Sequence, residues 1–431
     1  MRFAVALITL CAFSLLTAGV ASSDELSDLK TQVEKLMQRI EELEKKQKEQ
    51  AEEVKKVPQI AGSVEELKKA PSASQVVEKA LGKGVKLGGH FKFFLADQST
   101  GESNGVDQDN SLSAGVSDMW LYFRKSISDW MAIDVAPHIY AVASATPSLG
   151  GGITRSSTSS VQIDLDEAYL TIRTPQPYNL EFKAGAMYPM FSEEYATKTW
   201  WHEQYHGNQA LVNLEAWRSA GIEVYRNFDF EDFSLPVYFY PWLNGEDTNN
   251  TWPSPTPYKY TDNNSYKNLL LHVAPNFFAY GARIKLLGSL GWGIWDTNGD
   301  KNSWQYALGF DVNYHEFNFS GEYLNRTRYD VPLLGAGLAD GANEGYYIRG
   351  KYTYSPKWAV LAKYSDVDLF LPGITQMLTD NYKTISLSLN YWIWEGVSDI
   401  IPQVEYVDAE RSDGSQKLEY WRWTIGWRTT F

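Results

Sequence analysis

Two histidines with a glutamate between them are the residues in this chain whose types and spacing most resemble a catalytic set. His202, Glu203 and His206 belong to the run His-Glu-Gln-Tyr-His. On an α-helix the two histidines would lie one turn apart on the same face, where both rings could bind Zn²⁺ while the glutamate acts as a general base. The spacing is therefore that of a zinc peptidase.

The surroundings of this motif argue against catalysis. A zinc peptidase needs a long buried helix and a third ligand, whereas Gly207 follows the motif at once, inside a connection between two alternating segments. The nearest downstream carboxylates are Glu215 and Glu223, and Glu223 falls in an expected strand. We therefore predict no enzyme activity, no metal site and no cofactor. Adventitious or structural metal binding by the two histidines is the alternative.

The last twelve residues indicate where the chain resides. Trp421, Trp423, Ile425 and Trp427 alternate with Arg422, Thr424, Gly426 and Arg428, and the chain ends on Phe431. Successive side chains of a strand point to opposite faces, so one face is suited to lipid and the other to water. A terminal aromatic residue is also typical of bacterial outer-membrane barrels. We expect a transmembrane β-barrel in the bacterial outer membrane.

Composition supports a barrel. The chain contains 16 Trp and 27 Tyr, which is heavy use of residues that favour the lipid–water boundary. After the N-terminal run, no apolar stretch reaches the length of a spanning helix. The formal net charge of −14 argues against nucleic acid as a partner.

The first 21 residues have the features of a secretory signal peptide. A basic start, Met1-Arg2, precedes an apolar run over residues 4–16, and the small residues Gly19 and Ala21 favour cleavage after Ala21. The only cysteine, Cys11, lies inside that run. The mature chain is therefore expected to have no disulfide and no cysteine pair that could attach haem.

Residues 22–56 carry a heptad pattern. Its apolar seam consists of Leu26, Leu29, Val33, Leu36, Ile40 and Leu43. Spacings of three and four with charged residues on the other faces predict a short coiled coil. We expect it in the periplasm, where it assists oligomerisation and contacts periplasmic or cell-wall components. A single amphipathic helix on a partner surface is the alternative. Residues 57–84, interrupted by proline and glycine, are expected to form a linker before a barrel over residues 85–431.

Hydrophobicity alternates along about sixteen segments from residue 85 onward. The predicted strands are 85–96, 114–126, 130–144, 160–174, 178–188, 218–226, 232–242, 277–287, 290–297, 303–314, 317–326, 344–354, 358–367, 382–394, 399–409 and 418–431. Short connections, such as 288–289, alternate with long ones, of which 98–113, 189–217, 244–276 and 327–343 are the longest. Short periplasmic turns and long outer loops are typical of bacterial barrels. The first and last strands should pair, because lipid tolerates no open sheet edge. Sixteen strands leave an aqueous channel.

Turning the apolar rows outward places charged residues toward the lumen. The candidate pore-lining cations are Lys92, Arg124, Arg173, Lys183, Arg283, Lys285, Arg349, Lys351, Arg422 and Arg428, with Lys86 and Lys363 in the same rows. Inward acids, such as Glu223, Glu322 and Glu405, are fewer. An excess of cations favours anions in a narrow pore. The alternative is that these charges pair across strands and leave a polar, weakly selective lumen.

The connection over residues 189–217 is a candidate constriction loop, because it follows the fifth strand, the usual origin of a loop that folds into the pore. The candidate residues are Glu193, Glu194, Trp200, Trp201, His202, Glu203 and His206. An external or oligomer-contacting loop is the alternative.

Four short stretches carry a family resemblance. They are Leu-Tyr-Phe at 121–123, Asp-Glu-Ala-Tyr-Leu at 166–170, Lys-Ala-Gly-Ala-Met-Tyr-Pro-Met-Phe-Ser-Glu-Glu at 183–194 and Arg-Ser-Ala-Gly-Ile at 218–222. In their order and spacing the chain resembles phosphate-selective porins of the O and P type, and the wider set of trimeric sixteen-stranded porins with an N-terminal coiled coil. The resemblance implies a trimer and diffusion of small anions or other solutes. It assigns no binding residues here.

These observations predict an outer-membrane porin through which small hydrophilic solutes or ions diffuse passively, with a mild preference for anions. Its expected partners are outer-membrane lipid and further copies of itself, most simply in a trimer. The alternative function is a barrel sheath that encloses an electron-transfer protein or another partner.

Overall fold

The computed structural model describes residues 85–103, 111–142, 145–148, 152–155, 160–197, 214–215, 219–244, 267–294, 301–333, 337–369, 381–410 and 417–431. The expected signal peptide, coiled coil and linker, and the His202–His206 motif with Trp200 and Trp201, lie outside these residues. No helix among the described residues is long and apolar enough to cross a membrane.

Nearly all of the described chain is β-structure. The strands are β1 (Val85–Ser103), β2 (Ser111–Ser128), β3 (Met131–Val142), β4 (Ala145–Ser148), β5 (Gly152–Arg155), β6 (Ser160–Arg173), β7 (Glu181–Met187), β8 (Ser219–Asp229), β9 (Phe233–Asn244), β10 (Lys267–Val273), β11 (Asn276–Ala279), β12 (Ala282–Ile294), β13 (Asn302–Tyr314), β14 (Phe317–Leu333), β15 (Gly337–Ser355), β16 (Trp358–Asp368), β17 (Asn381–Trp394), β18 (Ser398–Glu410) and β19 (Lys417–Thr430). One short helix, α5 (Glu193–Ala196), follows β7.

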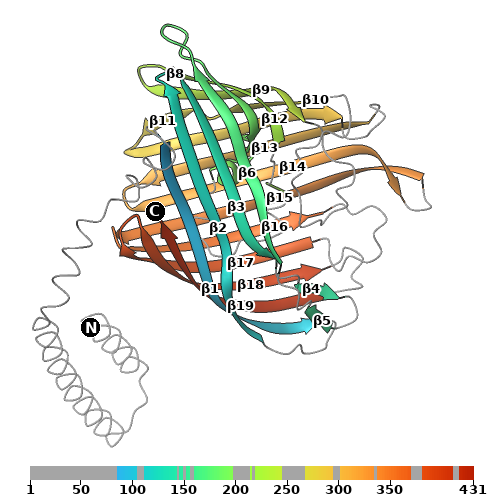
Figure 1. Cartoon of the computed structure of the whole chain (residues 1–431). Coiled ribbons are helices and arrows are strands. Elements are labelled where there is room, and N and C mark those ends of the chain that lie inside the picture. The colour runs from blue at the N-terminus through green and yellow to red at the C-terminus, as the bar shows by residue number, and fades with distance from the viewer. Residues whose placement is uncertain are drawn as a thin grey trace, which may run out of the picture. The chain divides into compact units, whose positions relative to one another are not determined.

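The strands form one closed antiparallel barrel, in which consecutive strands lie side by side (Figure 1). Segments β10 and β11 both pair with β9 and β12, so they are two halves of one strand. The seventeen-segment sheet therefore has sixteen strands, as predicted. The short pair β4–β5 forms a separate hairpin between β3 and β6.

The barrel closes where β19 pairs with β1, which confirms the expected pairing of first and last strands. Phe431 extends this contact, because its backbone exchanges hydrogen bonds with Gly89 at 3.0 and 3.1 Å. A Cβ atom at Gly89 would lie 2.5 Å from the Phe431 ring. The absence of a side chain at this position lets the end of the chain approach β1.

Side chains alternate across the wall as the sequence predicts. On β19, Trp421, Trp423, Ile425 and Trp427 are about half exposed, while Thr424 and Arg428 between them are buried. On β17, Ile385 and Leu387 are exposed, and Ser386 and Ser388 are buried. Apolar rows thus face out and polar rows face in, which is the arrangement of a barrel in lipid.

The predicted eighth and ninth strands are wrong in position, although the total is right. The chain turns at Tyr280 and Gly281, whose φ angles are 51° and 77°, and β12 runs without a break through Gly288 and Ser289, the expected turn. Two consecutive left-handed residues match the twist of a tight hairpin, but Gly288 and Ser289 are equally common in turns. The eighth strand therefore begins at Lys267, inside the predicted loop 244–276.

Two other expected outer loops are mostly strand. Strands β14 and β15 stay paired up to Leu333 and Gly337, inside the predicted loop 327–343. Strands β1 and β2 similarly stay paired as far as Gln98 and Ser111. Polar outer hairpins have no lipid-facing apolar row, so alternating hydrophobicity does not mark their ends.

Candidate functional site

The described parts of the 189–217 connection lie against the inner wall of the barrel. After β7, the Phe191 N–H closes a turn on the Pro189 carbonyl, and Ser192 caps α5 by accepting a hydrogen bond from the Tyr195 N–H at 3.3 Å. Serine is a favoured N-cap, and acids are favourable in the first helical turn. This short helix presents Glu193 and Glu194 to the facing strands.

The base of the loop is held by hydrogen bonds to β9 and β12. The Met190 N–H donates to the Tyr240 hydroxyl at 2.9 Å, and that hydroxyl donates to Glu223 at 2.7 Å. Ser289 donates to the Phe191 carbonyl at 2.7 Å, and His272 contacts the Ser289 hydroxyl through Nδ1 at 2.8 Å. Buried donors and acceptors need such partners, so these bonds fix the path of residues 189–191.

The acidic helix is held by ion pairs. Lys363 of β16 binds both carboxylate oxygens of Glu194, at 2.7 and 2.8 Å, and both side chains are almost fully buried. Lys285 of β12 pairs with Glu193. The Glu194 N–H donates to Glu322 of β14 at 3.0 Å. Three strands far from β7 in the sequence therefore bind this helix.

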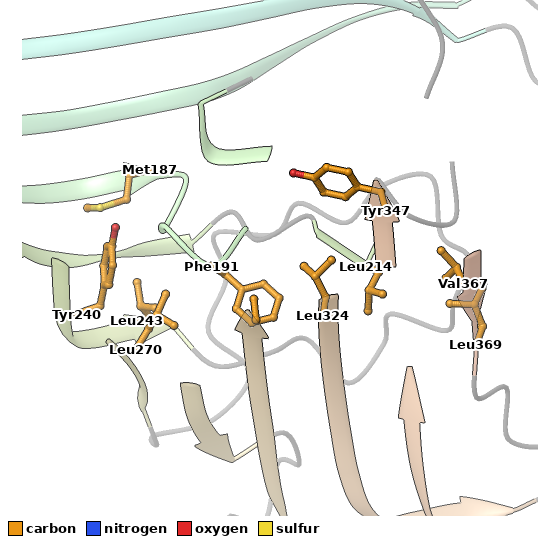
Figure 2. Packing of buried hydrophobic residues seen from close by; sticks show 11 residues of the cluster. Met187, Phe191, Leu214, Tyr240, Leu243, Leu270, Leu324, Tyr347, Val367 and Leu369 are labelled. Atoms are coloured by element: carbon orange, nitrogen blue, oxygen red, sulfur yellow. The ribbon is translucent and has the colours of Figure 1, made fainter. Parts of the chain in front are cut away.

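An apolar cluster inside the barrel packs against the same segment (Figure 2). Phe191 and Leu214 of the connection lie among Leu324 of β14 and Tyr347 of β15, with Met187, Tyr240, Leu243, Leu270, Ala307, Val367 and Leu369 completing the cluster. Arg326 lies over the Phe191 ring at 4.8 Å from its centroid. Burying apolar side chains in the lumen stabilises the inward position of the loop.

Glu215 is a buried carboxyl group at this site. It is 1% exposed, and neither of its carboxyl oxygens has a hydrogen-bond donor among the residues that the structure describes. Burial raises the pKa of its carboxyl well above the ordinary value, and the Glu194 carboxylate raises it further, while Lys363 opposes the shift. The charged form of Glu215 is therefore less favourable here than in water.

Most predicted pore-lining cations have a carboxylate partner. The pairs are Arg124–Asp134 at 3.4 Å, Arg173–Glu181 at 2.7 Å, Lys183–Glu223 at 2.8 Å, Arg422–Glu405 at 2.7 Å, Arg428–Asp399 at 2.6 Å and the Lys285–Glu193 contact. Arg283 and Arg349 donate to Asn276 and Asn318. Lys92 is buried on β1, in register with Arg428, and Lys351 is half-buried on β15. These cations are thus spread around the wall, and Lys285 binds Glu193 of the described loop segment.

Sequence reasoning missed Tyr240, His272 and Ser289 as anchors of the loop. Each is an ordinary strand residue, and its role arises only because β9, β10 and β12 pass beneath the loop. The alternation of the sequence placed Lys363 on the inner face, but its ion pair with Glu194 joins residues 169 positions apart. No local pattern signals such a contact. The Ser192-Glu193-Glu194 run, by contrast, carries a helix-start signal.

We searched the described residues of the site for a metal-binding arrangement. No group of three or more His, Cys, Asp or Glu side chains suited to a metal ion occurs in the described part of the chain. Beside Glu193 and Arg349 lies a cavity of about 40 Å³, large enough for one or two water molecules but not for a solute.

The fold is similar to those of solved outer-membrane proteins. The outer-membrane channel DcaP of Acinetobacter baumannii aligns with a TM-score of 0.51 at 13% identity, over 80% of this chain and 97% of that one. OprB of Pseudomonas putida aligns with a TM-score of 0.51 at 11% identity, over 84% and 97%. No protein-family model matches the chain. No curated protein matches it either.

Proposed function

We propose that this protein is an outer-membrane porin, a water-filled channel for passive diffusion of small hydrophilic solutes. The observation that carries the proposal is an inward-folded loop segment, held by Lys363, Lys285 and Tyr240, inside a closed sixteen-stranded barrel. A segment held against one side of the lumen narrows the pore at that level. The known channel DcaP, whose fold is similar, is consistent with this function.

Membrane insertion is supported by the outer face. Aromatic side chains stand exposed at or beside the short turns, as at Trp130, Tyr178, Phe278, Tyr354 and Trp394. Near the opposite ends of β13 and β19, Tyr306 and Trp421 are exposed. Aromatic girdles at both boundaries and an apolar band between them are typical of barrels in lipid. We propose the outer membrane as the location, with residues 1–21 as signal peptide, residues 22–56 as a periplasmic coiled coil and a trimer as the assembly.

We further propose that the pore discriminates little between ions. On the inner wall, a carboxylate oxygen lies 3.4 Å or less from a side-chain nitrogen of each of four cations, Arg124, Lys183, Arg422 and Arg428. A paired charge produces a weaker field along the pore than a lone one. The mild anion preference expected from counting cations is correspondingly reduced, and uncharged hydrophilic solutes are the substrate class that fits best. Phosphate selectivity gains no support.

A sheath around a partner protein is less consistent with the structure. Phe191, Leu214 and Glu194 occupy the space next to the inner wall and are themselves buried there. A protein threaded through the lumen would have to displace these contacts.

The test is single-channel conductance of the purified protein in planar bilayers, with the reversal potential measured in a KCl gradient. We expect stepwise openings and a reversal potential near zero. Folded, heat-modifiable protein that gives no openings would refute the porin function. A large reversal potential of either sign would refute weak selectivity alone.

A further inference from the structure

An apolar groove of about 570 Å³ lies on the outer face of the wall, where β16, β17, β18, β19 and β1 run side by side (Figure 1). Val360 of β16 pairs with Leu389 of β17, and Ile425 of β19 pairs with both Pro402 of β18 and Leu95 of β1. All five residues line the groove. Ligand pockets in proteins measure about 300–1,000 Å³, so the groove has the size of a binding site.

Differences in side-chain size create this groove. On β18 the short side chain of Val404 points outward, in register with Leu387 on one side and Trp423 on the other. Those two larger side chains are 49% and 58% exposed and form the banks of the groove. An empty apolar hollow loses the dispersion contacts of its lining, so in a membrane it favours an apolar chain that fits it.

The groove runs from the short-turn boundary to the middle of the membrane. Val360 is close to the start of β16, beside the turn at residues 356–357, whereas Ile425 lies near the middle of β19. A strand crosses a bilayer in about 9–11 residues, so Ile425 is near the midplane. Strands lie about 4.8 Å apart, and a row over five strands is therefore about 19 Å long. One leaflet of the hydrocarbon core is ~15 Å deep, so the groove matches the path of an acyl chain.

The shallow end of the groove carries groups that suit a lipid headgroup. The rings of Trp358 and Tyr391 lie there with their centroids 4.2 Å apart, and such rings favour the lipid–water boundary. Lys357 precedes Trp358 and is exposed, and an ammonium group binds phosphate well. Glu395, which follows β17, is exposed as well. A headgroup with both a phosphate and an ammonium complements these two charges better than a purely anionic one.

We propose that this groove binds one phospholipid of the periplasmic leaflet, with an acyl chain along the row from Val360 to Leu95 and a phosphate–ammonium headgroup near Lys357 and Glu395. Phosphatidylethanolamine has this chemistry. The inference rests on the proposed outer-membrane location, with the short turns in the periplasm, and adds a lipid site on the outside of the channel.

A second copy of the chain suits the groove less well than a lipid does. Two upright barrels are both convex, so they touch over a narrow strip of their walls. The groove instead extends across five of the sixteen strands. A single flexible chain can follow this path, whereas the wall of another barrel covers only part of it.

The primary test is native mass spectrometry of the folded protein in detergent, after delipidation, with dipalmitoylphosphatidylethanolamine as the added probe. We expect the natural protein to bind one lipid per chain. Val404→Trp fills the groove from its floor and should abolish this binding. The matched control is Val312→Trp, which adds the same ring to the outward row of β13, outside the groove and in register with Phe319, and should bind as the natural protein does.

Lys357→Gln tests the headgroup contact without altering the groove. Loss of a charge-assisted hydrogen bond to phosphate should weaken binding roughly tenfold. Lys125→Gln is the control, because Lys125 is exposed near the short-turn end of β2 and does not line the groove. Dipalmitoylphosphatidylglycerol, which has no ammonium, should bind the natural protein more weakly than the first probe does, and Glu395→Gln should remove that difference.

Equal lipid binding by Val404→Trp and Val312→Trp would overturn the proposal, and so would a natural protein that binds no lipid. Unchanged binding in Lys357→Gln, or equal binding of the two probes by the natural protein, would overturn the headgroup assignment. A Val404→Trp protein that still binds lipid but loses its oligomeric state would assign the groove to a second copy instead.

The porin function fails by a different measurement. Folded protein without conductance would refute it, whatever the lipid binding. Because the groove lies outside the lumen, Val404→Trp should conduct as the natural protein does, so the two failures are distinguishable.

Discussion

Lys363 and Glu194 are 169 residues apart in the sequence, yet the lysine Nζ lies 2.7 Å from a glutamate carboxylate oxygen, and the two side chains are 5% and 2% exposed. This pair joins the wall of the barrel at β16 to the helix that follows β7. Because the partners come from opposite halves of the chain, the contact requires that the fold bring those halves together. The inward position of the loop is thus a consequence of the whole fold.

Lys363→Gln should release the loop. The substitution leaves Glu194 buried beside Glu215 and Glu322 without a cation, and breaking a buried pair in this way costs about 3–5 kcal/mol. We expect larger or noisier single-channel currents, because the loop leaves the wall. The control is Lys417→Gln, whose lysine is about half exposed and pairs with Glu419 on the same strand. Equal conductance in both variants would show that the ion pair does not hold the loop.

Tyr240→Phe tests the hydrogen bonds at the base of the loop. The change removes the hydroxyl that accepts from Met190 and donates to Glu223, leaving the buried Met190 N–H without an acceptor and one oxygen of Glu223 without this donor. We expect about 1–3 kcal/mol of lost stability for the docked loop, measured as faster proteolysis of the folded protein within residues 189–217. Tyr354→Phe is the matched control, because Tyr354 is 68% exposed on β15. A cleavage rate unchanged from the natural protein would exclude Tyr240 as an anchor.

The barrel could be predicted from the sequence because its determinants are local. Each strand carries its own alternation, and the row from Trp421 to Trp427 identifies lipid and lumen faces without knowledge of any neighbour. The count of sixteen follows from the number of alternating segments, and the pairing of β1 with β19 follows from closure in lipid. The misplaced eighth strand shows where local patterns fail to locate a turn. Tyr280-Gly281 and Gly288-Ser289 both suit a turn. Only the pairing of β12 with β13 decides between them.

The contacts of the loop could not be predicted for a different reason. The place of Glu193 and Glu194 after the fifth strand led to the prediction that they belong to a loop folded into the pore. Their ion pairs with Lys285 and Lys363 depend on the register and tilt of strands that lie 92 and 169 residues further along the chain. The same holds for Glu215, whose missing partner is visible only once its surroundings are known. Cross-strand pairing of the cations was open from the sequence as an alternative, and the structure favours it.

Gly281→Ala should destabilise the folded barrel. With φ at +77°, a side chain at this position adopts a left-handed conformation that costs about 1–2 kcal/mol. The nearest atom that a Cβ would meet lies 3.7 Å away, so the effect comes from the backbone and not from a clash. Equilibrium unfolding in urea from lipid vesicles measures it. Gly350→Ala, where a Cβ meets nothing within 4 Å and φ is not left-handed, should be neutral. Equal stabilities would argue against the tight turn at residues 280–281.

Arg428→Gln should destabilise the folded barrel more than Arg124→Gln does. Arg428 binds Asp399 through two nitrogens at 3.0 and 2.6 Å, and both side chains are buried. Arg124 is 41% exposed and lies 3.4 Å from Asp134. We expect a loss of about 3–5 kcal/mol for the first variant and about 0–1 kcal/mol for the second, from the same urea unfolding. Adding Asp399→Asn to Arg428→Gln should recover part of the loss. A double variant no more stable than the single one would contradict pairing as the cause.

Ion selectivity should respond to the loss of one partner of an inner-wall pair. Glu405→Gln leaves the Arg422 guanidinium without its carboxylate, so anions should be favoured, whereas Arg422→Gln leaves the acid and should favour cations. A unit charge about 6 Å from an ion in a water-like medium contributes ~0.7 kcal/mol, which is roughly a threefold change in the permeability ratio. The reversal potential in a KCl gradient should therefore move in opposite directions for the two variants.

The pair of variants also separates two explanations of weak selectivity. If the natural pore is weakly selective because its charges are paired, each single variant shifts it and the double variant returns it toward the natural value. If instead the pore is too wide for any wall charge to matter, all three variants keep the natural reversal potential.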